Sequence, residues 1–471
     1  MTSHPIAETV ASLMPGARSE LAELVAFRSV ADWAQFPKSE SEGAANWVAD
    51  ALRAEGFRDV ALLDTPDGTQ SVYGFLPGPE GAPTVLLYAH YDVQPPLDEA
   101  AWVSPPFELT DRDGRWYGRG AADCKGGFVM HLLALRALKA NGGVPVSVKV
   151  IVEGSEEQGT GGLQQYAEAH PELLTSDAIV IGDAGNFRLG LPTVTATLRG
   201  MTLVRVEVDT LEGNLHSGMF GGAAPDALAA LIRVLDSLRS ENGSTTVDGL
   251  AADAAWEGLQ YPESDFRGDA KVLDGVGLIG EGDGTVADRL WARPAVTVLG
   301  IDCPPVVGAT PSVHASAKAL ISLRVPPGMD TVEANKLLEA HLVAHTPWGA
   351  RVRTEQVGQG QPFQGDTGSP AYASMAAAMR VAYPGQEMQA AGMGGSIPLC
   401  NTLQGLYPEA EILLIGLSEP EAQIHAANES VSPEELERLS VAEAERILAD
   451  ARREAEEIRA EADDYVDSKL A

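Results

Sequence analysis

Cysteine and long apolar runs are both scarce in this chain. Only 3 of its 471 residues are cysteine (Cys124, Cys303 and Cys400), and their scattered positions exclude a disulfide framework and a zinc finger. No apolar run approaches the roughly 20 residues that a membrane-spanning helix needs. The opening segment MTSHPIAETVASLMPGARSE has neither the basic head nor the apolar core of a signal peptide. We therefore expect free thiols and a cytoplasmic protein.

Basic residues are also few. The chain has 33 Lys and Arg against 67 Asp and Glu, a formal net charge of -34. Such a charge repels phosphate backbones and anionic lipid surfaces, so we expect neither nucleic acid nor membrane as a partner. With 45% hydrophobic residues, the composition is that of a globular protein, and its length provides enough core for an enzyme.

The chain begins and ends with an α/β pattern. Two helical patterns occupy about 5–57, and the second should be capped by Ser39 or Ser41 and closed by Gly56. Strands and helices then alternate, which predicts an α/β sheet. The expected strands are 59–64, 71–77, 83–90, 146–153 and 177–183, with helices after Lys125 and Gly161. The pattern resumes near 361 with a helix at 369–382, the loop 390–398 and a strand at 411–417.

Between these parts the pattern changes. From about residue 200 the strand MTLVRVEVD alternates cleanly, as expected of a sheet with one solvated face. Further strands near 295–300, 316–325 and 350–357, with helices at 225–239 and 331–345, indicate an α+β insert. We predict a catalytic domain from 1–199 and 359–471, and an inserted domain at 200–358. Beyond about 450 the final charge-rich helix should be solvated or fray.

The stretch IVEGSEEQGTGG places two adjacent carboxylates, Glu156 and Glu157, at the carboxyl end of a predicted strand. Open α/β sheets bind ligands at that edge. Neighbouring side chains point in different directions there, so one carboxylate can face a cation while the other faces a substrate. By itself such a pair is more typical of a solvated acidic loop.

Four further positions fall at similar places. His90 ends a strand with Asp92 two residues on, Asp123 follows a Gly-rich turn before a helix, Asp183 ends another strand, and His425 follows a late one. Singly, these residues are typical of a core histidine, a helix cap and turns. Together they offer imidazole and carboxylate without thiolate, which suits zinc, manganese or cobalt. In a binuclear peptidase, one carboxylate bridges the two metals and another carboxylate, which binds no metal, acts as the base.

The chain also resembles a known family. Eight motifs in order are similar to those of the carnosinase-like dizinc dipeptidases, and together they cover the chain to about 450. These belong to the metallopeptidases that include aminoacylase, glutamate carboxypeptidase and succinyl-diaminopimelate desuccinylase. The motifs are HYDVQP (90–95), WVSPPFE (102–108), DGRWYGRGAADCKG (113–126), EGSEEQGTGG (153–162), NLHSGMFGG (214–222), ISLRVPP (321–327), GMGGSIP (392–398) and HAANE (425–429).

The resemblance implies a zinc-exopeptidase-like α/β catalytic domain with an inserted α+β lid and dimerisation domain. It implies that Asp123 bridges two metals, most simply zinc, and that Glu156 is the general base with Asp92 as the partner of His90. The remaining implied ligands are His90 and Asp183 at one metal, and Glu157 and His425 at the other. Cys124 is not an expected ligand, although the resemblance implies a cis peptide bond before it.

Further roles fall in the insert and in the loop 390–398. The resemblance implies that His216 stabilises the oxyanion in the partner subunit's site, which requires a homodimer, and that Thr310 faces the same site. Arg324, Gly395 and Ser396 would hold the substrate's carboxylate. A structural ion pair for Arg324 and a simple tight turn at 392–398 are the alternatives.

The function implied is hydrolysis of dipeptides with a free C-terminal carboxylate. The carboxypeptidase and desuccinylase branches usually carry Glu where this chain has Asp183, which favours a dipeptidase. The alternative is an amide hydrolase of another branch, such as an N-acyl amino acid deacylase, a desuccinylase or a carboxypeptidase. A non-catalytic descendant is a second alternative, but it would be expected to lose Glu156 or a ligand, and this chain keeps them all.

Overall fold

The computed structural model describes residues 4–470 and divides into two compact units. The first comprises residues 4–196, 365–391 and 399–470, and the second comprises 197–364 and 392–398. The segment 392–398, which we placed in the catalytic domain, thus groups with the insert. The reason is local packing, since the Arg199 amide donates to the Met393 carbonyl and Gly392 lies against Trp291.

The largest sheet has nine strands among the described residues, in the order β1-β2-β6-β3-β7-β17-β8-β15, with β16 also paired to β8. Its centre is parallel, because β3 pairs in parallel with β6 and β7, and β7 with β17. The carboxyl ends of these four strands therefore share one edge. The strands are β1 (Arg58–Asp64), β2 (Gln70–Leu76), β3 (Thr84–His90), β6 (Ser147–Glu153), β7 (Ala178–Ile181), β8 (Thr193–Leu198), β15 (Phe363–Gln364), β16 (Gln389–Met393) and β17 (Glu411–Leu414).

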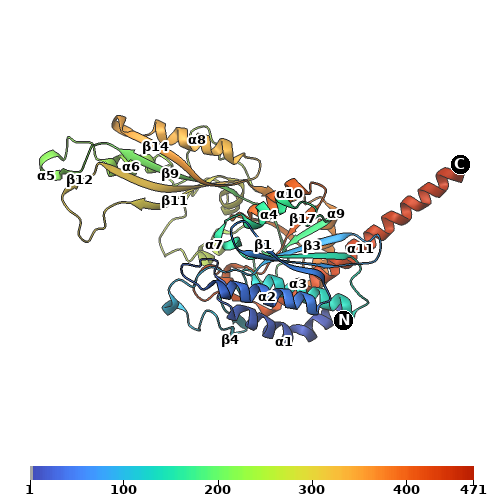
Figure 1. The fold of residues 1–471 in the computed structure, drawn as a ribbon. Helices are drawn as coiled ribbons and strands as arrows, with labels where there is room; N and C mark the ends of the chain where they lie inside the picture. The colour runs from blue at the N-terminus through green and yellow to red at the C-terminus, as the bar shows by residue number, and fades with distance from the viewer. Residues whose placement is uncertain (1–3, 471) are drawn as a thin grey trace. The chain divides into compact units, whose positions relative to one another are not determined.

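Helices cover both faces of this sheet (Figure 1). Val85 and Leu87 of β3 pack in one apolar cluster with the helices of one face, whereas Leu86 and Tyr88 are buried outside that cluster, on the other face. A strand buried on both faces is expected to be apolar throughout, as β3 is. The first face carries α1 (Pro5–Ala26), α2 (Lys38–Ala54), α3 (Lys125–Ala140), α9 (Pro370–Ala382) and α11 (Pro433–Leu470), and the other carries α4 (Gly162–Ala169) and α10 (Pro398–Leu406).

Two glycines at the start of α3 allow close approaches, Gly127 to the residue after β7 and Gly126 to the turn that precedes the helix. A Cβ at Gly127 would lie 2.3 Å from the Gly182 carbonyl oxygen, and one at Gly126 would lie 2.2 Å from that of Ala121. Such distances leave no room for a side chain. The sequence KGG therefore brings Asp123, just before the helix, next to Asp183, just after the strand.

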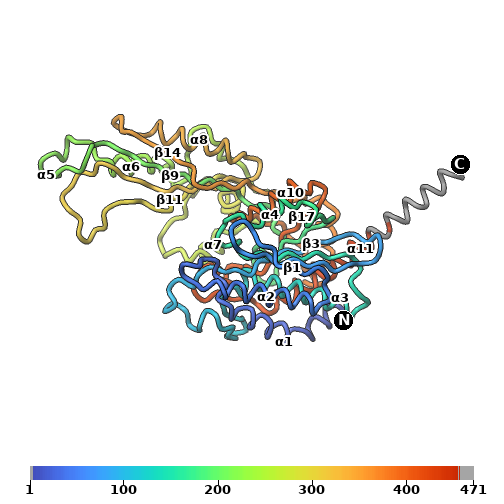
Figure 2. Tube along the Cα trace, in the orientation of Figure 1, coloured from blue at the N-terminus to red at the C-terminus, as the bar shows by residue number. Residues whose placement is uncertain are grey.

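The second unit is an α+β domain built on a four-stranded antiparallel sheet in the order β11-β13-β9-β14. Figure 2 shows β9, β11 and β14 running side by side, with α6 and α8 nearby. Both helices pack on the sheet through a separate apolar cluster that includes Val206, Leu231, Ile321 and Leu338. The elements are β9 (Gly200–Asp209), α6 (Ala227–Asp236), β11 (Ala295–Asp302), β13 (Ser316–Val325), α8 (Thr331–Ala344) and β14 (Arg351–Gly360).

Several short elements complete the fold. A small sheet joins β4 (Thr110–Arg112), β5 (Arg115–Tyr117) and β18 (Ser430–Val431), and β10 (Leu215–His216) pairs with β12 (Ser312–Val313). The short helices α5 (Ser217–Phe220) and α7 (Glu263–Asp269) lie in the second unit. Along residues 4–470, no helix combines the length and apolarity that crossing a bilayer requires.

One expected helix start is wrong. The second helix begins at Lys38 after Pro37, without a side-chain cap, and Ser41 is buried inside it. Proline fixes an extended backbone there, which starts the helix before either serine. The helix end is confirmed, because Gly56 follows it with φ +76°, the left-handed conformation that glycine adopts readily.

Candidate metal centre

His90 lies at the carboxyl end of β3 and is fully buried. Its Nε2 is 3.1 Å from Oδ1 of Asp123 and 3.2 Å from Oδ1 of Asp183. On the other side of the ring, Nδ1 lies 3.0 Å from the Asp92 carbonyl oxygen and 3.4 Å from its carboxylate. If Nδ1 carries the ring hydrogen and donates it to Asp92, the Nε2 lone pair faces the two carboxylates.

His425 makes a matching set of contacts with other groups. Its Nε2 is 3.0 Å from Oδ2 of Asp123 and 3.1 Å from Oε2 of Glu157. Glu157 lies in the short turn that follows β6. The backbone of His425 has φ +62°, an uncommon conformation for a side-chain-bearing residue, and its imidazole is half exposed. Solvent therefore reaches this side of the cluster.

The two oxygens of Asp123 face different imidazoles, one toward His90 and one toward His425. The four contacts between imidazole nitrogens and carboxylate oxygens span 3.0–3.2 Å. A tetrahedral metal with bonds of about 2.0–2.1 Å separates its ligand atoms by about 3.3 Å. The five predicted ligand residues are thus brought together with spacings that fit two metals sharing the carboxylate of Asp123.

Asp92 positions the acidic pair. Its carboxylate is fully buried and accepts the amide hydrogens of Glu156 (3.1 Å) and Glu157 (3.0 Å). The same residue contacts His90. Asp92 therefore ties the end of β3 to the turn after β6, and so fixes where the two glutamates lie.

Glu156 stands apart from the imidazole contacts that Glu157 makes. Burial, followed by the negative charge of Asp183, raises the pKa of Glu156 well above its usual value. A carboxylate of raised pKa beside a metal site is suited to accept a proton near neutral pH. The structure thus distinguishes two adjacent residues that look alike in the sequence.

The charges in the cluster are strongly coupled. Burial raises the pKa of Asp183 to about 6 despite the nearby His90. Burial also acts on Asp123, but hydrogen bonds from His425 and His90 outweigh it and hold the pKa of Asp123 well below its usual range. The hydrogen bonds to Asp123 and Glu157 raise the pKa of His425 to about 10. Asp123 and the two imidazoles therefore stabilise one another's charged forms, and a divalent cation that binds here would displace protons from the imidazoles.

Sequence reasoning did not assign a role to Glu429, Arg119 or Gln94. The buried Glu429 carboxylate accepts the amides of Gly120, Ala122 and Asp123 and pairs with Arg119 at 2.7 Å. Gln94 donates to the Glu157 carboxylate at 2.9 Å. The signal for Glu429 was its place at the end of HAANE, and for Gln94 its place in HYDVQP.

The cysteines are free thiols, as expected. Cys124 is buried beside His90 and Asp183, close enough for its sulfur to join a possible ligand group. However, its Sγ donates a hydrogen bond to the Gly182 carbonyl, and burial raises the pKa of this thiol well above its usual value. A neutral thiol is a poor metal ligand. The peptide bond between Asp123 and Cys124 is cis, as the resemblance implies.

Two of the residues expected to act in the partner's site lie in one corner of the second unit. His216 ends β10 opposite Ser312, and its Nδ1 accepts the Gly218 amide while the ring is exposed. The exposed Thr310 lies beside them, with its hydroxyl 3.1 Å from that of Ser312. The antiparallel β10 and β12 pair therefore holds His216 and Thr310 close together on the surface of this unit.

The expected carboxylate-binding residues also lie in the second unit. Arg324 is half-buried in β13, and burial lowers its pKa. Gly395 and Ser396 lie in the segment 392–398, where a Cβ at Gly360 would come within 3.3 Å of Ser396 Oγ.

Arg199 lies near these residues, although no role was predicted for it from the sequence. Only 8% of Arg199 is exposed, and its Nε and Nη1 have no hydrogen-bond partner among the described residues. Burial, and then the charge of Arg324, lowers its pKa to about 10. A Cβ at Gly394 would lie 2.8 Å from Arg199 Nη2, so this guanidinium lies against the segment 392–398. A buried cation without a counter-charge is costly, which indicates a place for an anion.

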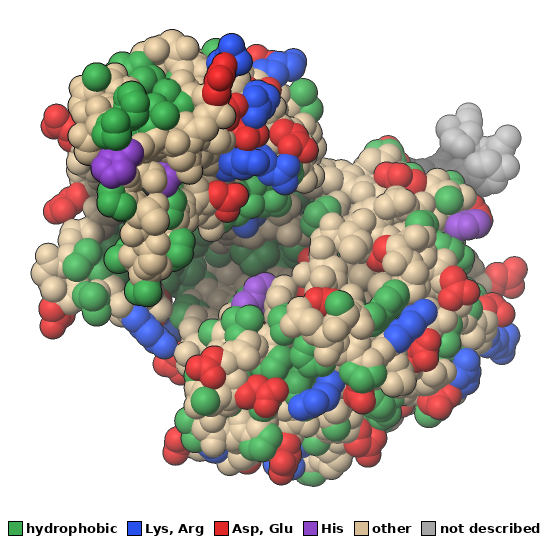
Figure 3. Space-filling model, turned by 60° about the vertical axis from the view of Figure 1, so that its left-hand side comes forward, with side chains coloured by type: hydrophobic (Ala, Val, Ile, Leu, Met, Phe, Trp, Pro, Cys, Tyr) green, Lys and Arg blue, Asp and Glu red, His purple; other side chains and the backbone are tan. Residues whose placement is uncertain are grey.

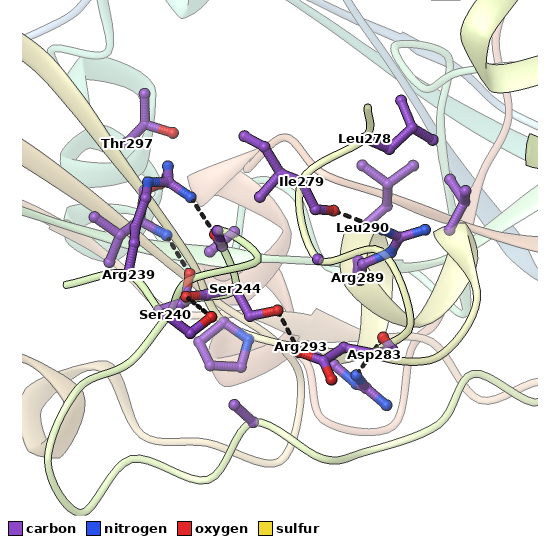
Figure 4. Close-up of a pocket in the computed structure, with 18 of the residues that line it drawn as sticks. Arg239, Ser240, Ser244, Leu278, Ile279, Asp283, Arg289, Leu290, Arg293 and Thr297 are labelled. Atoms are coloured by element: carbon purple, nitrogen blue, oxygen red, sulfur yellow. Dashed lines mark hydrogen bonds between the residues drawn. The ribbon is translucent and has the colours of Figure 1, made fainter. Parts of the chain in front are cut away.

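A separate pocket of about 630 Å³ lies within the second unit and contains none of the predicted site residues (Figure 4). Arg239, Arg289 and Arg293 line it, and each donates to backbone carbonyls. Those arginines hold loops together there.

On the face drawn in Figure 3, acidic side chains are scattered widely and basic ones stand singly or in small groups.

Imidazoles and carboxylates that converge at the carboxyl edge of an α/β sheet, with a spare carboxylate beside them, define the site of a metal-dependent hydrolase. Comparison with known proteins agrees. The model of peptidase family M20/M25/M40 matches residues 86–447, and the chain belongs to this family of peptidases.

Its relatives include several dipeptidases. The chain is 46% identical to the cysteinylglycine-S-conjugate dipeptidase of Corynebacterium striatum, covering 91% of this chain and 94% of that protein. It is 26% identical to the human Beta-Ala-His dipeptidase, covering 82% and 80%. Among solved structures, human carnosine dipeptidase 1 shares the fold with a TM-score of 0.80 at 24% identity, covering 95% of this chain and 98% of that one.

Proposed function

We propose that this peptidase hydrolyses dipeptides that have a free C-terminal carboxylate, with two divalent metals bound at the cluster around Asp123. The observation that carries the proposal is that each Asp123 oxygen faces its own imidazole and that each imidazole faces one further carboxylate. His90, Asp123 and Asp183 would hold one metal, and His425, Asp123 and Glu157 the other. Zinc is the ion that suits these ligands most simply.

When bound, such metals polarise the scissile carbonyl and lower the pKa of a bound water. Glu156 then takes the proton from the attacking water and delivers it to the leaving amine. Its raised pKa suits both steps, because the carboxylate must hold the proton between them. Asp92 is a positioning residue, because it holds the Glu156 amide and the His90 ring in place.

Recognition of the substrate's carboxylate falls to Arg324, Gly395 and Ser396, and we add Arg199 to this set. Its Nε and Nη1, which have no hydrogen-bond partner among the described residues, and the charge of its neighbour Arg324 together place two poorly solvated positive charges near each other in the second unit. A carboxylate is the natural counter-charge for paired guanidinium groups. A fixed carboxylate pocket would limit the substrate to a short peptide.

We also propose a homodimer in which His216 acts on the partner's substrate. The exposed β10 and β12 corner supports this role, because a histidine there can donate to a developing oxyanion. The edge strand β11 supports the association, since Val298, Leu299 and Ile301 are exposed along it. An unpaired apolar edge strand is a ready template for pairing with another chain.

The name of the bacterial relative, a cysteinylglycine-S-conjugate dipeptidase, suggests which substrates to try first. We therefore place Cys-Gly and its S-substituted forms at the head of a substrate panel, beside β-Ala-His. The alternative, an amide hydrolase of another branch, shares the same ligands. Only assays with substrates of each class can distinguish a dipeptidase from such an amide hydrolase.

The decisive experiment strips the metal, restores zinc, manganese or cobalt one at a time, and assays dipeptides, N-acetyl amino acids and succinyl-diaminopimelate. Dipeptide hydrolysis should return with metal and fall about 100- to 10,000-fold in Glu156→Gln, while metal content is unchanged. The control is Glu172→Gln, because Glu172 is a highly exposed acid outside the cluster. Unchanged turnover in Glu156→Gln would refute the mechanism, and selective release of acetate or succinate would refute the dipeptidase assignment.

A further inference from the structure

A second cluster of metal-ligating side chains lies in the second unit, outside all the residues assigned so far. It consists of His341 and His345, one helical turn apart at the end of α8, and of Asp248 in the loop that follows α6. His345 Nε2 lies 2.9 Å from Asp248 Oδ2, and His341 Nδ1 lies 3.4 Å from the same oxygen. The two imidazole rings stack with centroids 4.0 Å apart.

We propose that Asp248, His341 and His345 form a binding site for a divalent transition-metal ion, separate from the catalytic centre. The site rests on three independent features of its residues: the tautomer of His341, the spacing of the ligand atoms and the open side toward solvent.

The hydrogen bonds around His341 set its tautomer. The Ser237 hydroxyl donates its hydrogen to the Val234 carbonyl, so its oxygen can only accept from His341 Nε2, 3.1 Å away. His341 Nδ1 must then carry a lone pair, and it accepts the Asp248 amide at 3.1 Å. A histidine whose second nitrogen donates to a fixed acceptor is the usual arrangement of a metal ligand.

Two of the three spacings between the ligand atoms are close to those around a metal, and all three atoms lie within 4.8 Å of one another. Asp248 Oδ2 is 2.9 and 3.4 Å from the two imidazole nitrogens, and adjacent ligands of a tetrahedral ion with bonds of about 2.0–2.1 Å are about 3.3 Å apart. An ion would take the His341 lone pair that now accepts the Asp248 amide. That amide must turn away, which an exposed loop residue permits.

The three residues differ in solvent exposure, so that one is fixed and two can move. His341 is buried and held by Ser237, whereas the side chains of His345 and Asp248 are 40% and 68% exposed. The buried imidazole gives a fixed anchor, and the other two can adjust to the ion while water completes its coordination. Two imidazoles with one carboxylate suit zinc, copper, nickel or cobalt, and disfavour magnesium and calcium.

A bound ion would link the loop around Asp248 to the end of α8. The two are already neighbours, because Val247 next to Asp248 packs in the same apolar cluster as Leu338 and Leu342 of the helix. The ion would therefore stiffen one end of the second unit without touching any residue proposed for catalysis.

The test measures zinc binding by equilibrium dialysis on the full-length enzyme, with its catalytic metals already loaded. We expect one further saturable equivalent of zinc per chain. In His345→Ala and in Asp248→Ala this equivalent should bind more than about 100-fold more weakly, since a lost ligand costs more than the about 10- to 100-fold of a lost outer partner. Ser237→Ala should weaken it about 10- to 100-fold. Dipeptide turnover should stay at the wild-type rate in all three.

The matched control is His170→Ala, because His170 is an exposed histidine with a carboxylate, Glu172, 3.9 Å away, but it belongs to no such ligand group among the residues that the structure describes. A second readout is Cu²⁺ added to the zinc-loaded enzyme. Its paramagnetic resonance spectrum should show two coupled imidazole nitrogens, and one in His345→Ala. Absence of the additional zinc equivalent, or its equal loss in His170→Ala, would overturn the proposal.

Discussion

Single residues around the cluster at Asp123 differ mainly in which groups they hold in place. Asp123 contacts both imidazoles, and its own position depends on Glu429, which accepts the loop amides of Gly120, Ala122 and Asp123 and the Arg119 side chain. A carboxylate is suited to this role because it accepts at both oxygens and donates at neither. Glu429 thus builds the loop that presents Asp123.

Glu429→Gln should therefore damage both folding and metal binding. The amide group of glutamine would turn a donor toward loop amides or toward Arg119, so we expect a loss of about 3–5 kcal/mol in unfolding free energy. Metal affinity should fall about 10- to 100-fold. Urea unfolding and chelator competition measure the two effects. Glu421→Gln, at an exposed acid near Arg115, should change neither; equal effects of both substitutions would contradict the role of Glu429.

A second buried residue, His131, links two helices to strand β3, which ends at His90. From α3 it contacts the Glu443 carboxylate of α11 at 2.8 Å and the Tyr88 carbonyl of β3 at 3.0 Å. Burial opposes its charge, but Glu443 outweighs burial and raises the pKa of His131 above its usual value. The folded protein therefore binds a proton here more tightly than the unfolded chain.

This shift makes stability depend on pH in one direction. The contribution of His131 should be complete below about pH 6.5, the unfolded pKa, and should be lost as pH rises through the raised folded pKa. We expect the difference in unfolding free energy between wild type and His131→Gln to shrink as pH increases from 5 to 9. Urea unfolding at several pH values measures it. A difference that stays constant or grows with pH would show that the ring is neutral in the folded state.

At the scale of elements, the edge strand β11 carries the clearest prediction. If the homodimer forms along this edge, Ile301→Lys should place a charge in the interface and shift the protein toward monomer, as light scattering after size exclusion would show. The control is Val357→Lys on β14, because that strand forms the opposite edge of the same sheet and Val357 is similarly exposed (39% against 43%). Dissociation by Val357→Lys alone would place the interface elsewhere.

The regular elements could be predicted from the sequence, because each carries a strong local pattern. The continuous apolar run at 83–90 became β3, and the strand expected at 316–325 became β13 with those same bounds. The segment 240–290 gave no such pattern, and its short helix α7 went unpredicted. Its polar and Gly-rich composition leaves the backbone to be fixed by side-chain contacts such as those of Arg289 and Arg293 with carbonyls.

The site residues likewise fall into two groups, those that the sequence could predict and those that it could not. His90 and Asp183 could be placed together because strand ends of a parallel sheet share an edge. Arg199 could not be recognised, because its proposed role rests on a feature that appears only after folding: two of its buried nitrogens have no partner in the part of the chain that the structure describes. The roles of Glu429 and Ser237 likewise depend on hydrogen bonds between segments far apart in the chain.

For the whole molecule, the proposed dimer makes each active site a product of two chains. Glu156 would act in its own subunit, whereas His216 would act in the partner's. A chain carrying Glu156→Gln and a chain carrying His216→Ala should each be nearly inactive as homodimers. In a mixed dimer, however, one site combines an intact Glu156 with the intact His216 of the other chain.

Equal mixing of the two variants by co-expression should therefore restore activity. Random pairing makes half of the dimers mixed, and one of the two sites in each is intact, so activity should reach about 25% of wild type. If His216 acted within its own subunit, every site would carry one defect and mixing would restore nothing. Co-expression of Glu156→Gln with a chain that carries both substitutions is the control, because no pairing then contains an intact Glu156 and it must stay inactive.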